Sequence, residues 1–333
     1  MTMGEICGPV LGGWGTFRMK RAFVFPGQGS QTVGMGRALA DAFSAARYLF
    51  AEVDEALSQR LSQLMFEGPE SDLILTENAQ PALLAASLAV VRVLEEEGGL
   101  VFGRHVAYVA GHSLGEYSAL AAARALSVGT AARLVKLRGQ MMQKAVPPGE
   151  GAMAALLGLD VDAARTIAAA AVSGPDEVCV VANDNAPGQV VISGHRHAVE
   201  RAMAIARERQ ARRSIVLPVS APFHSPLMAP AAEVMQKALD EAELRSPVVP
   251  LVTNVSASEI NDPAEIKRQL VGQVTAMVRW RESVLYLGTA EVEEVAEIGA
   301  GRVLAGLVRR IDPALATRSV GTPGEVEALI RAF

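Results

Sequence analysis

The sequence predicts an α/β protein in which a small α+β domain interrupts a larger α/β domain. Three observations support this prediction. Before residue 148, short apolar runs that end at Gly or Pro alternate with longer helical patterns. From about residue 150 the pattern changes to short strands and helices in the order βαββαβ, which is the order of a ferredoxin-like unit. Longer helical segments and apolar strands then return.

The part of the chain before the insert predicts two buried strands and several helices. Ala22 to Phe25 is a short apolar run that stops at Pro26-Gly27, as a strand does when it enters a tight turn. A second apolar run ends at Gly111 and is followed at once by an alanine-rich helix. The predicted strands span 22–25 and 106–110, and the main predicted helices span 34–50, 78–94 and 128–146.

The insert predicts four strands and two helices. Its strands span 152–158, 178–182, 189–193 and 214–219, and its helices span 161–171 and 198–209. The turn-rich run Asn183 to Gly188 joins the two middle strands. Beyond the insert, the apolar strands 248–252 and 292–298 return to the larger domain. We therefore expect a large domain at residues 19–148 and 217–333 and a small domain at residues 149–216.

The composition is that of a globular protein with a sizeable core, since 50% of its 333 residues are apolar and 20% are charged. The formal net charge of −5 argues against broad nucleic-acid binding, which needs a basic surface. The only cysteines, Cys7 and Cys179, are too few for a disulfide framework, and such sparse use is typical of a cytoplasmic protein. No motif predicts a metal site or a bound cofactor, and no apolar run predicts a membrane span. We also expect a monomer.

Residues 1–18 differ from the rest of the chain. The segment contains five glycines and no sustained apolar run, so it is a poor signal peptide. Met19 directly precedes the first predicted strand. We expect residues 1–18 to be a disordered extension or the product of a misplaced start, and a mobile cap over the fold is the alternative.

The segment Gly111-x-Ser113-x-Gly115 is the one strong catalytic motif. It lies between a predicted strand and a predicted helix, which is the setting of the nucleophile elbow in an α/β-hydrolase-like domain. The glycines permit a sharp turn that raises the serine hydroxyl above the sheet. The N–H of Leu114 then lies at a helix N-terminus, where it can stabilise an oxyanion. The alternative is an ordinary glycine-rich turn.

A nucleophilic serine needs a base, and histidine is the most common choice. The chain has five histidines: His105, His112, His195, His197 and His224. His112 adjoins Ser113 and so points elsewhere on the same turn, and His105 precedes a strand. His195 and His197 lie in a polar segment typical of a solvated loop. His224 follows the last strand of the insert, where the chain re-enters the large domain over a cleft. Position favours His224 as the base, and a structural histidine is the alternative.

Two further motifs accompany the elbow. The three segments are Phe25-Pro-Gly-Gln-Gly-Ser-Gln31, Gly111-His-Ser-Leu-Gly-Glu-Tyr-Ser118 and Ala221-Pro-Phe-His-Ser225. Together they resemble the malonyl-CoA:acyl carrier protein transacylases of type II fatty acid synthesis, which are related to the acyltransferase domains of polyketide synthases. The resemblance extends from Met19 to about Ile311, with the motifs in the family order. It also covers 185–193 and 297–301.

The resemblance implies a role for each of several residues. Ser113 resembles the nucleophile that becomes malonylated, and His224 resembles its general base. The N–H groups of Gln28 and Leu114 resemble the two oxyanion donors. The partner of the histidine in this family is usually a backbone carbonyl, here implied to be that of Gln273. The match around Gln273 is looser, because Ala276-Met277 stands where the family often has Asn-Pro.

The substrate site implied by the resemblance contains Arg138, Gln273, His112 and Phe223. Arg138 resembles the arginine that holds the malonyl carboxylate, and a planar guanidinium can bind a carboxylate through two parallel hydrogen bonds. Phe223 resembles the residue of malonyl-selective relatives whose ring narrows the space beside C2. The alternative for Phe223 is ordinary packing.

The implied reaction transfers a malonyl group from malonyl-CoA to the phosphopantetheine thiol of an acyl carrier protein, without a bound cofactor. A basic patch for an acidic carrier protein is one reading of six arginines, and solvated helix faces are the other. These are Arg207, Arg209, Arg212, Arg213, Arg309 and Arg310. Three functions remain as alternatives: a stand-alone polyketide synthase acyltransferase, a serine thioesterase or esterase that uses the same elbow, and a non-catalytic scaffold for carrier proteins.

Overall fold

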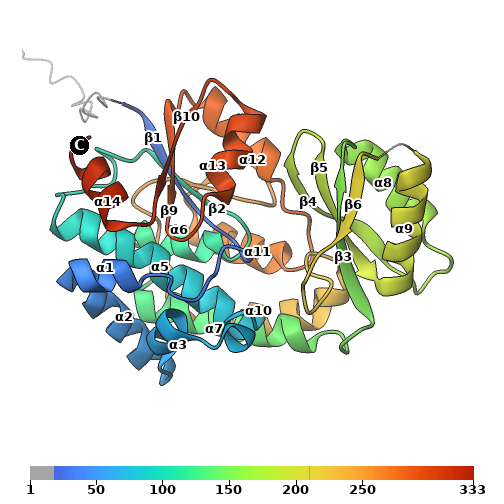
Figure 1. Cartoon of the computed structure of the whole chain (residues 1–333), viewed down its shortest axis with the longest axis horizontal. Coiled ribbons are helices and arrows are strands. Elements are labelled where there is room, and N and C mark those ends of the chain that lie inside the picture. Colours follow the sequence, from blue (N-terminus) through green and yellow to red (C-terminus); the bar gives the residue numbers. More distant parts are fainter. Residues whose placement is uncertain (1–18, 210) are drawn as a thin grey trace, which may run out of the picture.

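The computed structural model describes residues 19–209 and 211–333, and two separate sheets organise this part of the chain (Figure 1). The large sheet contains β1 (Arg21–Phe25), β2 (Tyr108–Gly111), β7 (Leu251–Val252), β8 (Glu259–Ile260), β9 (Glu294–Ile298) and β10 (Ala316–Val320). The small sheet contains β3 (Gly151–Leu157), β4 (Cys179–Ala186), β5 (Gln189–His195) and β6 (Arg213–Val216). The expectation for residues 1–18 lies outside the described residues.

Helices surround both sheets. Those before the small sheet are α1 (Arg37–Ala42), α2 (Ser44–Leu57), α3 (Leu61–Glu67), α4 (Glu70–Leu73), α5 (Thr76–Glu96), α6 (Gly115–Ala122) and α7 (Val128–Lys144). Two helices, α8 (Val161–Ala170) and α9 (Arg196–Glu208), accompany the small sheet and form with it the small body, while the remaining elements form the large body. The helices after the small body are η1 (Pro226–Met228), α10 (Ala229–Glu241), α11 (Pro263–Gln273), α12 (Trp280–Thr289), α13 (Val303–Ile311) and α14 (Pro323–Ile330). No helix within the described ranges is long and apolar enough to cross a bilayer.

The large sheet has the strand order β10-β9-β1-β2-β7-β8, and only the β7–β8 pair is antiparallel. The small sheet has the order β4-β5-β3-β6 and is antiparallel throughout. The prediction of an α/β fold is confirmed, and the structure adds that the large sheet is mostly parallel.

The inner strands β1, β2, β7 and β9 are largely buried on both faces, which explains their apolar character. Ala22 and Val24 of β1 pack with α12 and α13 on one face, whereas Phe23 and Phe25 pack with the helices on the other. Figure 1 shows α12 and α13 on one side of the sheet and α5 and α6 on the opposite side. Because these strands pair in parallel, their carboxyl ends and the turns that follow them lie at one edge of the sheet.

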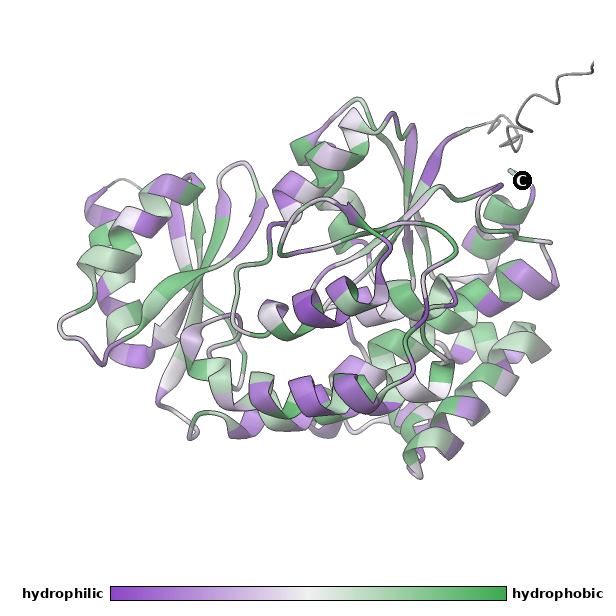
Figure 2. Cartoon of the chain, turned by 180° about the vertical axis from the view of Figure 1, so that it is seen from behind, coloured by the Kyte–Doolittle hydropathy of each residue, from purple (hydrophilic) through white to green (hydrophobic). Residues whose placement is uncertain are grey.

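The small sheet also has two apolar faces. Ala152, Ala154 and Leu156 of β3 pack under α8 and α9, while Met153 points into the core of the large body. Figure 2 shows hydrophobic strands inside both bodies and hydrophilic residues on the outward faces of many surrounding helices. The small body is therefore packed against the large one through its second face.

Strand β4 links the two bodies directly. The Val278 N–H donates to the Ala182 carbonyl oxygen at 2.9 Å, and the Asp184 N–H donates to that of Val278 at 3.0 Å. The buried Asp184 carboxylate accepts a hydrogen bond from Arg281 Nε at 2.8 Å. Val278 lies between α11 and α12, and Arg281 lies in the first turn of α12. These bonds therefore hold the small body against the end of the large sheet that carries the Ser113 turn.

Three local predictions were wrong. The predicted helix 34–50 is two helices, because Phe43 is extended (φ −128°, ψ 126°) and its ring packs against the main core. The predicted turn 183–188 belongs mostly to β4, since the pairing with Val278 and two register shifts extend the strand to Ala186. His195 and His197 are not in a loop: the first ends β5 and the second lies in α9.

Candidate active site

The turn after β2 carries the nucleophile candidate. A β-carbon on Gly111 would overlap the Gly115 carbonyl group, and a β-carbon on Gly115 would overlap the Phe25 carbonyl oxygen. Both positions therefore require glycine, which allows β2, the turn and α6 to approach one another closely. Ser113 has φ 55°, a left-handed conformation that is unusual for a residue with a side chain.

Ser113 and His224 meet across the two halves of the chain. The Ser113 Oγ lies 2.8 Å from His224 Nε2, and His224 Nδ1 lies 2.9 Å from the Gln273 carbonyl oxygen. His224 is buried and also has a positive φ, of 56°. The arrangement leaves Nε2 free to take a proton from the serine while Nδ1 donates to the carbonyl.

Helix α11 explains why a carbonyl can take the place of an acidic side chain. Gln273 is the last residue of α11, and the final carbonyls of a helix have no partner within the helix. These carbonyls also carry the negative end of the helix dipole. The Gln273 carbonyl oxygen is therefore available to accept a hydrogen bond from the Nδ1–H of His224, and it can stabilise a charged imidazolium.

The resting state of His224 is neutral. Burial lowers the pKa of His224 to about 3, with a further contribution from the positive charge of Arg138. A neutral imidazole is the form that can act as a base.

Arg138 lies beside the nucleophile in α7 and is 1% exposed. Its Nη1 donates to Gln80 Oε1 at 2.9 Å, and its Nη2 donates to Gln273 Oε1 at 2.8 Å and to Ser113 Oγ at 3.0 Å. Its Nε is buried without a hydrogen-bond partner among the described residues. The guanidinium therefore presents an unused donor next to the serine.

Two backbone N–H groups complete the expected set. The N–H of Leu114 begins α6, and that of Gln28 lies in the loop after β1. Neither donates to an acceptor within residues 19–209 and 211–333. The Gln28 side chain is anchored by its bond to Thr76 Oγ1 at 3.3 Å, which helps to orient this loop.

His112 and Phe223 lie near the turn but are engaged with other residues. His112 Nε2 is 2.9 Å from Asn185 Oδ1 of β4, and its ring lies beside that of Trp280 at 5.7 Å between centroids. Burial lowers the pKa of His112, and the bond to Asn185 opposes this shift. Phe223 is 7% exposed and belongs to the main hydrophobic core.

Three residues at this site were missed by the sequence analysis. Gln80 holds Arg138, while Asn254 and Glu116 lie behind the serine turn and are both buried. A polar residue inside an otherwise apolar, buried helix was an available signal for Gln80. The sequence offers no comparable signal for Asn254, because its partners are 138 to 143 residues away.

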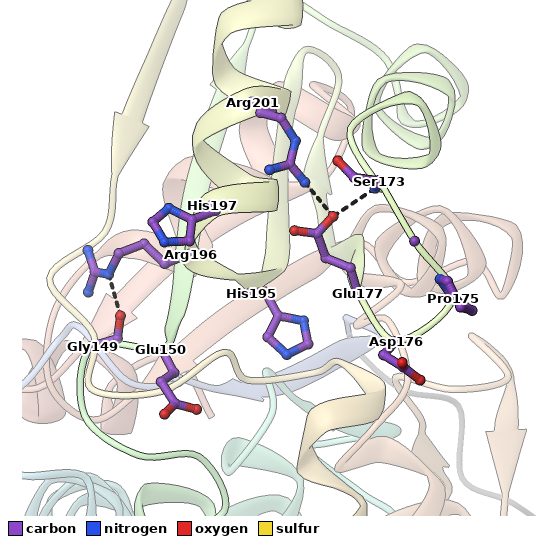
Figure 3. Close-up of a pocket in the computed structure, with 11 residues that line it drawn as sticks. Gly149, Glu150, Ser173, Pro175, Asp176, Glu177, His195, Arg196, His197 and Arg201 are labelled. Atoms are coloured by element: carbon purple, nitrogen blue, oxygen red, sulfur yellow. Dashed lines mark hydrogen bonds and ion pairs between the residues drawn. The ribbon is translucent and has the colours of Figure 1, made fainter.

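The remaining histidines do not take part in this cluster. His105 stacks on Phe333 with 4.8 Å between ring centroids. His195 and His197 line a surface pocket of about 630 Å³ on the small body, together with Glu177, Arg196 and Arg201 (Figure 3). This pocket is large but contains neither Ser113 nor His224, so the chemistry of the serine cluster identifies the candidate active site. No group of His, Cys, Asp or Glu in the described ranges could hold a metal ion.

The family of this chain follows from comparison with known proteins. A family model described as the acyl transferase domain matches residues 22–310. A malonyl CoA-acyl carrier protein transacylase from Bacillus subtilis is 46% identical over 312 residues, which cover 94% of this chain and 96% of that protein.

Solved structures agree with this assignment. The acyl-carrier-protein-S-malonyltransferase of Bartonella henselae is 51% identical and superposes with a TM-score of 0.92, over 94% of this chain and 99% of that one. A malonyl-transacylase solved in complex with its type II PKS acyl-carrier protein is 41% identical, with a TM-score of 0.90 over 94% of this chain and 100% of that one. The chain belongs to the acyl transferase family, and within it to the malonyl CoA-acyl carrier protein transacylases.

Proposed function

We propose that this chain transfers a malonyl group from malonyl-CoA to the phosphopantetheine thiol of an acyl carrier protein through a malonyl-Ser113 intermediate. The observation that carries the proposal is the serine–histidine–carbonyl line beside a buried arginine. Ser113 Oγ is 2.8 Å from the proposed base His224 and 3.0 Å from Arg138 Nη2.

In the first half-reaction, Ser113 Oγ attacks the carbonyl carbon of the malonyl thioester and its proton moves to His224 Nε2. The carbonyl π electrons move onto the oxygen, which the N–H groups of Gln28 and Leu114 stabilise. The tetrahedral intermediate then collapses, the C–S bond breaks, and the CoA sulfur takes the proton from His224. A malonyl ester on Ser113 remains.

In the second half-reaction, the carrier thiol gives its proton to His224 and attacks the malonyl ester. The new C–S bond forms as the ester C–O bond breaks, and Ser113 recovers the proton. The Gln273 carbonyl stabilises the imidazolium that exists during each half-reaction. The two transfers share one intermediate, which makes the scheme ping-pong.

Arg138 is the proposed binding residue for the malonyl carboxylate. Its unused Nε and its Nη2 lie on the same edge of the guanidinium. From this edge the guanidinium can donate two parallel hydrogen bonds to a carboxylate. Nη2 contacts both Ser113 and Gln273, so an incoming carboxylate replaces at least one of these contacts. His112 and Phe223 are proposed to line the acyl site, and Phe223 to restrict the space beside C2.

The proposed architecture is an α/β-hydrolase-like large subdomain with a ferredoxin-like insert. The element order β3-α8-β4-β5-α9-β6 and the sheet order β4-β5-β3-β6 support the second part. Proposed boundaries are 19–148 and 217–333 for the large subdomain and 149–216 for the small one. The monomeric state stays a prediction, which a sedimentation experiment would test.

The proposed partner is an acyl carrier protein, docked on exposed arginines at one end of the small sheet. Arg310 Nη2 lies 3.1 Å from the Pro187 carbonyl oxygen in the β4–β5 turn. The Gly158 N–H donates to the Gly188 carbonyl oxygen of that turn, and the Arg212 N–H donates to the carbonyl oxygen of the adjacent Leu157, both at 2.8 Å. Arg212 and Arg310, far apart in sequence, thus flank one turn, which supports a basic docking surface.

The deciding experiment follows the intact mass of the protein with malonyl-CoA and then with phosphopantetheinylated carrier protein. A mass gain of one malonyl group should appear in wild type, vanish in Ser113→Ala and persist in Ser118→Ala. Ser118 is a matched control, because it lies in α6 and its buried hydroxyl has no partner among the described residues. The adduct should then pass to the carrier.

Two other results would favour the alternatives. Release of free malonate without a carrier protein would favour a thioesterase or esterase. Absence of any adduct from any acyl-CoA would favour a non-catalytic scaffold. Running the second step with fatty-acid and polyketide carrier proteins in parallel decides between those two pathways.

A further inference from the structure

The side chain of Asn254 reaches the nucleophile turn from the neighbouring strand. Asn254 follows β7 by two residues, and β7 pairs in parallel with β2, whose end leads into the turn. Asn254 Oδ1 accepts the Ser113 N–H at 2.7 Å, and Asn254 Nδ2 donates to the Gly111 carbonyl oxygen at 2.7 Å. The asparagine is completely buried.

These two bonds have the pattern of a parallel β ladder. In such a ladder one residue bonds to a C=O and to an N–H on the two sides of a single residue of the next strand. Asn254 makes this pair of bonds on the two sides of His112, but with its side-chain amide. The β2–β7 main-chain pairing ends at Ala110 and Val252, so the amide extends the sheet beyond the point where the main chains diverge.

Ser113 needs this support because of its backbone conformation. A residue with a side chain in the left-handed region carries a strain of about 1–3 kcal/mol and stays there only when its surroundings hold it. The Asn254 bond to the Ser113 N–H fixes the peptide group immediately before the strained residue. The direction of the Ser113 side chain and of the Leu114 N–H follow from that conformation.

Glu116 anchors Asn254 from behind. Its Oε1 accepts the Asn254 N–H, and its Oε2 accepts Gln273 Nε2 at 2.7 Å. Burial raises the pKa of Glu116 to about 8, and the hydrogen bonds from Asn254 and Gln273 oppose this shift. Because both Glu116 oxygens accept, the nitrogen of the Gln273 amide is turned toward Glu116. The amide oxygen of Gln273 then faces Arg138 Nη2 at 2.8 Å. One buried acidic side chain therefore orients both the residue behind the serine and the residue behind the arginine.

We propose that Asn254 is a positioning residue for acyl transfer. Its side-chain amide holds the Ser113 turn in the conformation that aims Oγ at His224, and Glu116 holds Asn254 in place. Its side-chain amide bonds to the main chain of the turn, and its Oδ1 also lies 3.5 Å from Gln273 Nε2, so it acts on the reaction through these neighbours. The proposal rests on the serine mechanism proposed above.

The kinetic test compares Asn254→Ala and Asn254→Asp with Asn261→Ala, a control at an exposed asparagine on the same segment. In Asn254→Ala the rate of malonyl-Ser113 formation should fall about 100-fold, the effect of a misplaced reacting group. The KM for malonyl-CoA should change less than about 3-fold, because the bond of Arg138 to Gln80 is untouched. Asn254→Asp keeps an acceptor for the Ser113 N–H but loses the donor to the Gly111 carbonyl oxygen. Its rate should therefore lie between the rates of Asn254→Ala and Asn261→Ala.

A second measurement does not depend on turnover, and its wild-type part needs no variant. In wild type the Ser113 amide proton should exchange slowly with solvent, like that of His112, which donates to the Phe25 carbonyl oxygen at 3.0 Å. In Asn254→Ala only the Ser113 proton should become fast. If Asn254→Ala fails to fold, wild-type exchange and the Asn254→Asp rate decide.

The proposal is overturned by a folded Asn254→Ala protein with the wild-type rate of malonylation. It is equally overturned by an unprotected Ser113 amide in wild type. Slow exchange of the Ser113 amide proton in a wild-type protein that forms no malonyl adduct would refute the proposed function instead. The inference that Asn254 holds the Ser113 turn would then stand.

Discussion

The two side chains that are proposed to react, Ser113 and His224, both lie on residues with positive φ. Such conformations cost free energy and persist where tertiary contacts hold them. Here the contacts come from Asn254 on one side and from the end of α11 on the other. The chemistry of single residues at this site therefore depends on neighbours that are distant in sequence.

The role proposed for Arg138 predicts that the protein loses its selectivity for malonyl-CoA over acetyl-CoA when the guanidinium group is removed. Arg138→Lys should lower kcat/KM for malonyl-CoA about 100-fold, since each hydrogen bond to a charged group contributes about 1.5–3 kcal/mol. The rate with acetyl-CoA, which has no carboxylate, should stay nearly constant. Arg133→Lys, at an exposed position of the same helix, is the control. An equal loss for both substrates would contradict a role in carboxylate binding.

The neutral state of His224 predicts an unusual pH profile. Because the pKa of His224 is lowered to about 3, kcat/KM should show no loss near pH 6.5, where an ordinary histidine becomes protonated. The positive charge of Arg138 contributes to this low pKa, and a bound carboxylate neutralises it. The acid limb of kcat should therefore lie at higher pH than that of kcat/KM.

Quenched-flow malonylation between about pH 4 and pH 8 tests whether kcat/KM falls near pH 6.5 and locates an acid limb of kcat in that range. A midpoint near 6.5 in kcat/KM would contradict the prediction. The same pKa also affects stability: a histidine whose pKa is lower in the folded state stabilises it above the unfolded value of 6.5. That contribution should be lost as the pH falls from 6.5 toward about 3.

At the scale of elements, the ends of helices and strands are held by single buried side chains. Asn254 extends β7 across the turn, and Glu297 of β9 caps α13 in a comparable way. Glu297 accepts the N–H groups of Leu304 at 3.0 Å and Ala305 at 2.8 Å and is fully buried. These N–H groups would otherwise have no partner at the start of the helix.

Loss of this cap should destabilise the protein without changing its chemistry. Glu297→Ala leaves the first N–H groups of α13 unpaired and should lower the free energy of unfolding by about 1–3 kcal/mol. Urea unfolding measures the change, with the exposed Glu327→Ala as control. The malonylation rate of the folded fraction should match wild type. An unchanged urea midpoint would show that water replaces the carboxylate at no cost.

At the scale of the whole molecule, the small body carries the proposed docking surface and contacts the segment that holds the candidate active site. Its β4 strand pairs with the segment after α11, the helix that ends in the Gln273 carbonyl. Its β4–β5 turn gathers Arg212 and Arg310. One body therefore connects the proposed surface for the carrier protein with the position of the proposed base.

Charge reversal at this surface should weaken the second half-reaction. Arg212→Glu with Arg310→Glu should raise the KM for the carrier protein about 10-fold at low salt, and the difference should shrink as salt screens the charges. Arg245→Glu, at a site that is 73% exposed, is the control. Steady-state transfer at two ionic strengths measures the effect. A salt-independent loss would indicate a structural defect instead.

The sequence by itself determined the α/β class, the family, and the identity of the serine and histidine candidates. Apolar strand runs, glycine turns and short motifs are patterns of neighbouring residues, so they can be recognised in the sequence alone. The break of the helix at Phe43 and the length of β4 were missed, because distant packing and pairing decide them. Only the tertiary structure brought Asn254 and Glu116 to the turn, through bonds that span 138 to 143 residues. A buried polar side chain acquires its role from the partners that folding supplies, and no pattern along the chain contains them.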